Sequence, residues 1–212
     1  MNQRGVLTIV SGFAGSGKGT LMKRLLELHD NYALSISATT RSPRAGETEG
    51  KEYFFKTKEE FEEMIQEQAF LEYACYVGNY YGTPKFYVEE QLQAGRDVIL
   101  EIEIQGALAV KKMMPETVLV FVTPPTAEEL EKRLKGRGTE TEEVIRSRIR
   151  RAVEESEEML SYDYLLVNDD IEETTERLHA IIQSAHSEAA RHAAFAKEIQ
   201  AQLKALTDSC PA

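Results

Sequence analysis

The sequence predicts an α/β fold in which a parallel sheet carries helices on both faces. Two observations predict it: short apolar, β-branched runs recur along the chain, and segments with helical spacing of apolar residues lie between them. Strands that alternate with helices pair in parallel, because a helical crossover returns the chain to the same end of the sheet. With 212 residues, of which 42% are hydrophobic, the chain can bury one sizeable core.

The predicted strands of the sheet are residues 6–10, 98–104, 117–122 and 164–167. The first run stops at a Gly-rich turn, and residues 19–30 behind it have apolar side chains close to helical spacing. A strand, a Gly-rich loop and a helix in succession form the opening of a βα unit. The second run carries acids near its C-terminal end, and strand alternation would place Glu101 and Glu103 on one face.

Two stretches interrupt the alternation of strands and helices. Residues 37–88 are rich in Thr, Arg, Gly and Tyr and contain one amphipathic helix near 58–68, which predicts a small inserted subdomain with hairpin character. Residues 126–156 are highly charged and form a second, helical insertion. The core is therefore expected to comprise residues 1–36, 89–125 and 157–212, helical from residue 174 to 206.

The composition excludes some classes of function. A formal net charge of −11 argues against non-specific binding of nucleic acid, although a local arginine cluster can still bind a nucleotide. The sequence has no run of about 18 apolar residues and no signal-peptide pattern, so a cytoplasmic protein without a membrane partner is expected. Cys75 and Cys210 fit neither a disulfide framework nor a zinc site, and both are expected to be unpaired thiols.

The strongest local signal is the segment between the first strand and its helix, Gly12-Phe13-Ala14-Gly15-Ser16-Gly17-Lys18-Gly19-Thr20. Glycines let backbone N–H groups wrap a phosphate, and the following helix presents the positive end of its dipole. Lys18 would bring a charge to the β- and γ-phosphates of ATP. Gly19 stands where the usual pattern has a hydroxyl for Mg²⁺, so either Thr20 or water would take that place. The segment predicts a P-loop NTPase-type fold that binds ATP.

Acids near the phosphate loop suggest a metal site. Transfer of a phosphoryl group needs Mg²⁺ between the β- and γ-phosphates, and Mg²⁺ takes oxygen ligands while keeping several waters. Glu101, near the end of a neighbouring strand, is expected to hold this ion directly or through water. The alternative, that Glu101 and Glu103 are surface carboxylates at a strand end, stays open.

Arginines concentrate in both insertions. Arg41 and Arg44 lie three residues apart in a loop, and paired guanidinium groups suit a phosphate dianion, to which Tyr53 and Tyr81 could add hydroxyl donors. A mobile arm with several arginines can close over the transferring group and exclude water. The second insertion carries Arg133, Arg137, Arg146, Arg148, Arg150 and Arg151. Of these, Arg137 and Arg148 are assigned to the reaction and the other four to a solvated helix face.

Several segments together resemble guanylate kinase, from about residue 5 to 184. They are Ser37-x-x-Thr-Thr-Arg41-x-x-Arg44-x-Gly-Glu47-x-x-Gly50-x-x-Tyr53-x-Phe55; Phe70-Leu71-Glu72-Tyr73-Ala74 with Tyr80-Tyr81-Gly82-Thr83-Pro84; Glu101-Ile102-Glu103-Ile104-Gln105-Gly106; Leu134-Lys-Gly-Arg137-Gly-Thr139-Glu140; and Tyr162-Asp-Tyr164 through Asn168-Asp169. The resemblance implies an enzyme of purine nucleotide metabolism that transfers the γ-phosphate of ATP to GMP, with dGMP as a further expected acceptor. It also implies three parts: a P-loop core, a GMP-binding subdomain at 37–88 and an ATP-covering lid at 126–156.

The resemblance also implies roles for single residues. The GMP phosphate would be held by Arg41, Arg44, Tyr53 and Tyr81, and the guanine would be read by Ser37, Glu72 and Thr83. Glu103 would lie on the GMP side and Glu101 on the Mg²⁺ side; many family members have Asp at one or both positions, so direct metal contact stays open. Lys18, Arg41, Arg137 and Arg148 would act in catalysis, with Arg137 and Arg148 on the ATP phosphates and Asn168 near the adenine.

The chemistry of the base supports guanine as the target. Guanine offers two adjacent donors, N1–H and the N2 amine, and a carboxylate such as that of Glu72 accepts from both. Adenine would leave this carboxylate unpaired, which argues against a kinase for AMP or a pyrimidine monophosphate. A second rival is a related module that binds phosphopeptides without catalysis, and the intact Gly17-Lys18 argues against it. The sequence leaves open whether the protein is a monomer or a homo-oligomer.

Overall fold

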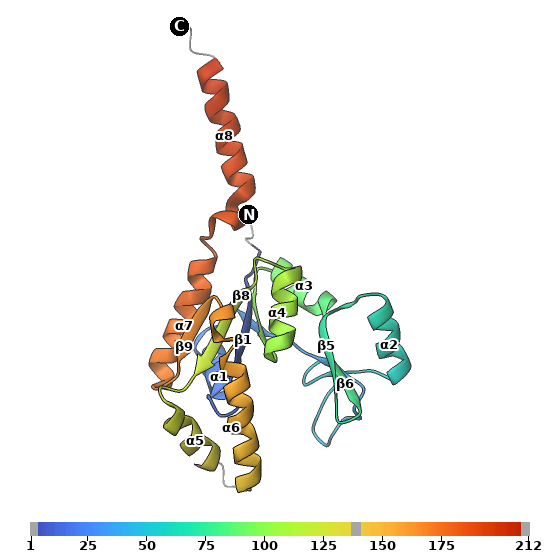
Figure 1. Ribbon diagram of the computed structural model, residues 1–212. Coiled ribbons are helices and arrows are strands. Elements are labelled where there is room, and N and C mark those ends of the chain that lie inside the picture. The colour runs from blue at the N-terminus through green and yellow to red at the C-terminus, as the bar shows by residue number, and fades with distance from the viewer. Residues whose placement is uncertain (1–3, 137–140, 209–212) are drawn as a thin grey trace.

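The computed structural model describes residues 4–136 and 141–208, and a five-stranded parallel sheet forms its centre (Figure 1). The strands are β1 (Leu7–Gly12), β2 (Tyr32–Leu34), β7 (Asp97–Glu101), β8 (Val118–Thr123) and β9 (Tyr164–Val167). Their order is β2-β7-β1-β8-β9, and each neighbouring pair is parallel. The four expected strands are all present, and the predicted fold class is confirmed.

Helices cover both faces of this sheet. The side chains of β1 alternate: Leu7 and Ile9 join one buried cluster, and Val10 joins the other. The first cluster includes residues of α3 (Lys85–Gln93) and α4 (Ile104–Met113), and the second includes residues of α1 (Lys18–Leu28) and α7 (Ile171–Ala185). Because a strand presents successive side chains to opposite faces, each face has its own core.

The register of the sheet brings the Gly-rich loop beside the acids. Val10 pairs with Glu101 on one side of β1, and Gly12 pairs with Val122 on the other. The loop therefore leaves the sheet between the ends of β7 and β8. In open parallel sheets, ligands bind at this edge, beyond the carboxyl ends of the strands.

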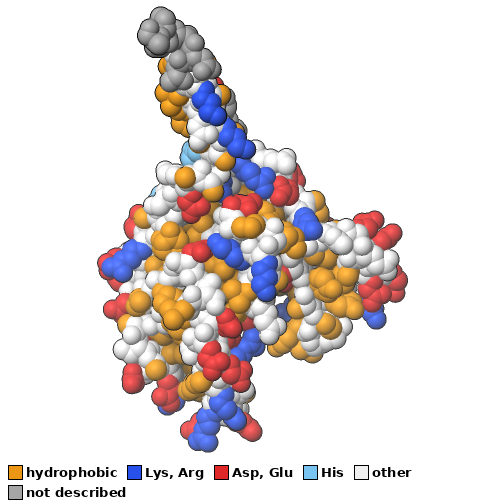
Figure 2. Space-filling view, turned by 45° about the horizontal axis from the view of Figure 1, so that its top comes forward, with side chains coloured by type: hydrophobic (Ala, Val, Ile, Leu, Met, Phe, Trp, Pro, Cys, Tyr) orange, Lys and Arg blue, Asp and Glu red, His pale blue; other side chains and the backbone are white. Residues whose placement is uncertain are grey.

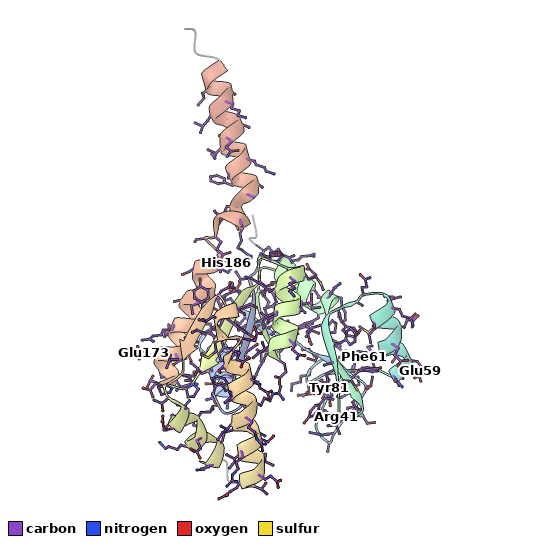
Figure 3. All side chains as sticks on the ribbon, in the orientation of Figure 1. Arg41, Glu59, Phe61, Tyr81, Glu173 and His186 are labelled. Carbon is purple, nitrogen blue, oxygen red and sulfur yellow. The ribbon has the colours of Figure 1, made fainter. Side chains whose placement is uncertain are left out.

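A second sheet forms the inserted subdomain that lies to the right in Figure 1. Its strands are β3 (Ala38–Thr39), β4 (Phe54–Phe55), β5 (Phe70–Tyr76) and β6 (Asn79–Pro84), in the order β4-β3-β6-β5. Helix α2 (Lys58–Gln66) covers it, and the ring of Phe61 stacks between those of Phe70 and Tyr80 at 4.3 and 5.1 Å (Figure 3). The predicted hairpin and amphipathic helix are thus both present.

The hairpin of the subdomain turns on two residues in the left-handed region. Val77 has φ 48° and Gly78 has φ 76°, between the last residue of β5 and the first of β6. Two-residue turns of this kind favour Asn-Gly, because a β-branched residue is strained at positive φ. We expect Val77→Asn to raise the free energy of unfolding by about 1 kcal/mol. Urea denaturation measures the shift.

A matched control for this change is Val153→Asn, which alters another exposed valine, on helix α6 (Glu142–Ser156). Helical backbone has negative φ, so this substitution relieves no strain and is expected to give no stabilisation. An unchanged urea midpoint for Val77→Asn would show that the turn stores no strain.

The remaining elements among the described residues are helices and 3-10 turns. The second insertion forms α5 (Ala127–Gly136) and α6, and a short 3-10 turn, Met159–Ser161, leads to β9. The segment expected to be helical at 174–206 is helical with one interruption: α7 ends at Ala185, a 3-10 turn occupies Ala189–His192, and α8 runs from Ala193 to Asp208. Helix α8 extends away from the body of the molecule (Figure 1).

None of the helices among the described residues is long and apolar enough to span a membrane. Cys75 is an exposed free thiol, and Cys210 lies outside the described residues.

Candidate functional site

The Gly-rich loop has the conformation that the sequence predicts. Gly12, Gly15 and Gly17 have φ angles of 143°, 91° and 91°, which residues other than glycine rarely adopt. A Cβ at Gly12 would lie 2.1 Å from the carbonyl oxygen of Val122, so any larger residue at this position would clash with the backbone of β8. A Cβ at Gly19 would meet nothing within 4 Å, so space does not explain the missing hydroxyl at this position.

Lys18 lies over the loop that it follows. Its Nζ donates hydrogen bonds to the carbonyl oxygens of Gly12, at 2.6 Å, and Phe13, at 3.1 Å. The amine thus lies on the inner side of the loop, within reach of any phosphate that the loop holds. Thr20, two residues further along α1, is exposed.

A cavity of about 240 Å³ lies beside this loop. Its lining includes Lys18, Glu101 and Glu103. Glu101 ends β7 and is exposed, whereas Glu103 lies outside the strand and forms the N-cap of α4. The expectation that alternation puts both acids on one face of a strand is therefore wrong, although both reach the same cavity.

The acids of the cavity suit an ion that arrives with a nucleotide. Mg²⁺ is held in such sites by one or two carboxylates together with phosphate oxygens and water. Glu101 is an exposed carboxylate at the sheet edge near Lys18, which is the required donor chemistry. The described residues contain no group of three or more His, Cys, Asp or Glu side chains placed to hold a metal ion.

Glu103 also links the core to the second insertion. The Nη2 of Arg151, on α6, donates to Glu103 Oε2 at 2.6 Å, and its Nε donates to Glu155 at 2.8 Å. The two carboxylates raise the pKa of Arg151, chiefly through the charge of Glu103. The assignment of Arg151 to a purely solvated helix face is therefore wrong, because it joins α6 to the cavity.

The half-buried carboxylate of Glu72 lies in the subdomain at the expected base site. Thr83 Oγ1 donates to Glu72 Oε1 at 2.7 Å across the β5–β6 pair, and Thr83 is fully buried. Burial raises the pKa of the Glu72 carboxyl, while the hydrogen bond from Thr83 opposes the rise. A Cβ at Gly106, on α4, would lie 3.3 Å from Glu72 Oε2, so the core helix closes one side of this site. Ser37, directly before β3, is half-buried.

The predicted phosphate-binding residues meet at the other end of the subdomain. The guanidinium carbon of Arg41 lies 5.3 Å from the ring centre of Tyr53, and the rings of Tyr53 and Tyr81 are 6.1 Å apart. Figure 3 labels Arg41 and Tyr81 near each other on the inserted subdomain, Tyr81 being a residue of β6. Arg44 is exposed on the same loop.

Glu47 organises this loop, and sequence reasoning gave it no role. Its Oε1 accepts from Arg41 Nη2 at 2.8 Å and its Oε2 accepts from the backbone N of Arg44 at 2.7 Å. The hydrogen bond to Glu47 raises the pKa of Arg41, and Arg41 lowers that of Glu47. The spacing of Arg41, Arg44 and Glu47 in one short loop was the available signal.

Helix α5 packs directly on the Gly-rich loop. A Cβ at Gly15 would lie 3.0 Å from Leu134 Cδ2 and 3.6 Å from Leu130 Cδ1. Arg133 Nη1 donates to the carbonyl oxygen of Asn168 at 2.9 Å, and its Nε donates to Glu129. The assignment of Arg133 to a solvated helix face is therefore wrong. Arg148, on α6, is half-buried, and Arg137 lies outside the described residues.

Asn168 supports the loop from behind. It is buried, and its Nδ2 donates to the carbonyl oxygen of Ser16 at 2.8 Å. A Cβ at Gly17 would lie 2.4 Å from this nitrogen, so the amide fits closely against the left-handed glycine. Together with Arg133, Asn168 connects α5 to the loop. A contact of Asn168 with adenine stays a prediction.

Comparisons with known proteins agree on one family. The family model for guanylate kinase matches residues 4–185. The guanylate kinase of Lactococcus lactis subsp. lactis is 53% identical over 186 residues, 88% of this chain and 91% of that protein. The guanylate kinase of Bacillus anthracis is 51% identical over 199 residues, 93% of this chain and 97% of that protein. The crystal structure of guanylate kinase from Anaplasma phagocytophilum matches with a TM-score of 0.68 and 33% identity, covering 89% of this chain and 90% of that one.

Proposed function

Because the chain belongs to the guanylate kinase family, it transfers the γ-phosphate of ATP to GMP, and we propose roles for its residues in that reaction. The observation that carries these roles is the half-buried Glu72 carboxylate, held by Thr83 in the same subdomain as Arg41. A carboxylate acceptor for the base and a guanidinium donor for the phosphate match the two ends of GMP. We also expect dGMP to be accepted and, because the substrates are soluble nucleotides, the cytoplasm to be the place of action.

GMP is proposed to bind along the inserted subdomain. Glu72 accepts from N1–H and N2 of guanine, and the residues beside it, Ser37 and Thr83, complete the base site. The phosphate is bound by Arg41 and the exposed Arg44, with hydroxyl donors from Tyr53 and Tyr81. Since Glu47 pairs with Arg41 in the structure, phosphate binding requires Arg41 to exchange this carboxylate for the substrate.

ATP is proposed to bind over the Gly-rich loop. Backbone N–H groups of residues 12–20 surround its phosphates, and Lys18 leaves the loop carbonyls to reach the β- and γ-phosphates. Arg137 and Arg148 of the second insertion contribute further charge. Glu101 and Thr20 are the residues that would hold Mg²⁺, in part through water, and when bound the ion neutralises charge between the β- and γ-phosphates.

The reaction follows from this placement. A phosphate oxygen of GMP attacks the γ-phosphorus of ATP in line, and the bond from that phosphorus to the oxygen of ADP breaks. Protein residues need not form a covalent intermediate, because positioning and charge stabilisation carry phosphoryl transfer. Lys18, Arg41, Arg137 and Arg148 bind the oxygens on which charge develops.

The test of this function is release of ADP in a coupled assay with ATP, Mg²⁺ and each of GMP, AMP, CMP and UMP. Turnover with GMP alone is the expected result. Turnover with AMP would overturn the role of Glu72, and folded protein that phosphorylates none of the four would favour a binding module without catalysis.

Arg41→Met is expected to lower kcat about 100-fold, because methionine keeps the length of the side chain and removes its charge. Arg146→Met is the control, since Arg146 is exposed on α6 and pairs only loosely, at 3.5 Å, with Glu142. The melting temperatures of both variants verify that they fold. A kcat equal to that of the wild type would remove Arg41 from charge stabilisation.

Asn168→Ala is expected to weaken binding of ATP and of inorganic tripolyphosphate alike, each about tenfold. The reason is that loss of one buried hydrogen bond costs ~1.4 kcal/mol and frees the loop at Ser16. Asp169→Ala, at the exposed neighbouring position, is the control. Calorimetry with both ligands in the presence of Mg²⁺ separates the alternatives: weaker binding of ATP alone would mean that Asn168 contacts the base and does not act through the loop.

A further inference from the structure

Glu72 lies where the inserted subdomain meets the core. The two residues before it belong to different cores: Phe70 joins the apolar cluster of the subdomain, and Leu71 joins the cluster that includes Ile104 and Ala107 of α4. The register of β5 with β6 shifts between Phe70 and Glu72, and such an irregularity redirects the side chains of a strand. Helix α4 therefore lies beside β5, as Figure 1 shows, and Glu72 lies at their contact.

Two residues flank the carboxylate of Glu72, one from the subdomain and one from the core. Thr83 of β6 donates to Oε1 at 2.7 Å. On the other side, a Cβ at Gly106 of α4 would lie 3.3 Å from Oε2 and 3.4 Å from Cγ, which is shorter than most real Cβ contacts. The lack of a side chain at residue 106 therefore lets the carboxylate lie close against the first turn of α4, where the helix dipole is positive.

Backbone conformation does not account for the glycine at residue 106. Gly106 is the third residue of a regular helix and has no positive φ angle. A glycine in a helix lowers stability relative to alanine, because it leaves the unfolded chain more freedom. The close approach of Glu72 is therefore the feature of this site that requires it.

The position of Glu72 differs from that of the acids on α2. Glu59, Glu60 and Glu63 are exposed, and acidic side chains gather at the outer edge of the subdomain in Figure 2. Water and ions screen carboxylates at such positions, and a small displacement changes little. Glu72 is half-buried between Thr83 and α4, so a displacement of its oxygens alters what they can bind.

We propose that Gly106 is a positioning residue for guanine recognition, which sets the orientation of the Glu72 carboxylate; the inference rests on the proposed role of Glu72. A carboxylate that accepts from both N1–H and the N2 amine must present its two oxygens side by side to the edge of the base. Thr83 fixes one oxygen, and Gly106 leaves room for the other. A methyl group at residue 106 would push Oε2 away by a few tenths of an ångström, and the tilted carboxylate would lengthen one of its two hydrogen bonds to guanine.

Gly106→Ala tests this role, because it adds one methyl group and favours the helix. We expect kcat/KM for GMP to fall about tenfold, the effect of weakening one hydrogen bond to a charged group, with KM for ATP unchanged. The melting temperature is expected not to fall, since the added methyl meets only the flexible side chains of Glu72 and Ile102 and alanine stabilises a helix relative to glycine. A lower melting temperature together with a raised KM for ATP would indicate general damage and overturn the proposal.

Ala109→Gly, at an exposed position of α4, is the matched control. It makes the reverse change of side chain on the same helix, so the melting temperature should fall while the kinetics with GMP equal those of the wild type. If KM for GMP changed in this variant as well, it would follow the stability of α4 and not the space beside Glu72, and the proposal would be wrong.

A double-mutant cycle with Glu72→Gln shows whether Gly106 acts through Glu72. In the Glu72→Gln background, adding Gly106→Ala is expected to lower kcat/KM for GMP by about twofold at most, because the carboxylate whose position it sets is gone. The same tenfold loss in both backgrounds would overturn the proposal, as would wild-type kinetics of Gly106→Ala when Glu72→Gln alone is impaired. If Glu72→Gln alone kept the wild-type kcat/KM for GMP, the proposed role of Glu72 would fail, and that of Gly106 with it.

Discussion

Lys18→Met is expected to lower kcat about 1,000-fold, equivalent to ~4 kcal/mol of lost stabilisation of the transition state. Methionine has a similar length but no charge, so it removes the one ammonium group that lies on the inner side of the Gly-rich loop among the described residues. Charge develops on the transferring phosphoryl group as the bond to ADP breaks, and a fixed cation in a site without bulk water stabilises it strongly. Steady-state kinetics with saturating ATP and GMP measure the change.

The control for this substitution lies on the same helix. Lys23 is 80% exposed on α1 and has only a long contact of 3.9 Å with Glu27, so Lys23→Met should leave kcat within a factor of two or so of the wild type. Lys18→Arg is expected to restore little, because the wider guanidinium does not fit where an ammonium lies between two carbonyl oxygens. A Lys18→Met enzyme with wild-type kcat would show that the backbone of the loop and the arginines suffice for transfer.

The sequence was sufficient for the parts of the fold that depend on local pattern. The short apolar runs formed four strands, and the amphipathic pattern near 58–68 formed α2. The sequence did not predict β2, because a strand of three residues beginning at Tyr32 is too short to give a periodic signal. Such a strand forms only because β7 offers it an edge to pair with.

The end of β7 shows the same limit more directly. Residues 98–104 read as one β-branched strand, yet the register with β1 stops at Glu101. Ser11 then donates its hydroxyl to the carbonyl oxygen of Ile102, and Glu103 has φ −69° and ψ 156°, which start α4. Propensity favours continuation of the strand here, and tertiary contacts override it.

The contacts that join distant parts of the site have no local signature. Asn168 and Arg133 are 35 residues apart, and Arg151 and Glu103 are 48 residues apart. An arginine on a charged helix usually faces solvent, and it is the tertiary packing that gives these two a partner beyond their own helix. Residue types predicted the chemistry of the site, whereas the residues that connect its parts could be identified only from the fold.

The second large effect is expected at the base site, where Glu72→Gln should lower kcat/KM for GMP about 1,000-fold. Thr83 donates to Oε1 of residue 72, so in the variant the amide oxygen keeps this position and the amide nitrogen replaces Oε2. A donor would then face the N1–H of guanine, and two donors repel. The amide nitrogen can instead donate to N1 of adenine, which is an acceptor, so kcat/KM for AMP should rise in the same enzyme.

The pH dependence of the two enzymes gives an independent test of this role. Burial raises the pKa of Glu72 above the ordinary range of a glutamate, and a protonated carboxyl would present a donor to guanine. The ionised form binds GMP, so KM for GMP should rise as the pH falls through this raised pKa, while KM for ATP stays level. Glu72→Gln has no such group and should show no rise in KM for GMP over the same range.

A matched variant distinguishes base reading from a general loss of charge in the subdomain. Glu63 is an exposed glutamate on α2, and Glu63→Gln removes the same charge at a position facing solvent, so KM for GMP and its pH profile should match those of the wild type. If Glu72→Gln kept its preference for GMP over AMP, guanine would be recognised by other groups, such as the hydroxyls of Ser37 and Thr83. The Glu72 carboxylate would then serve only to hold β5 against β6, through the hydrogen bond that it accepts from Thr83.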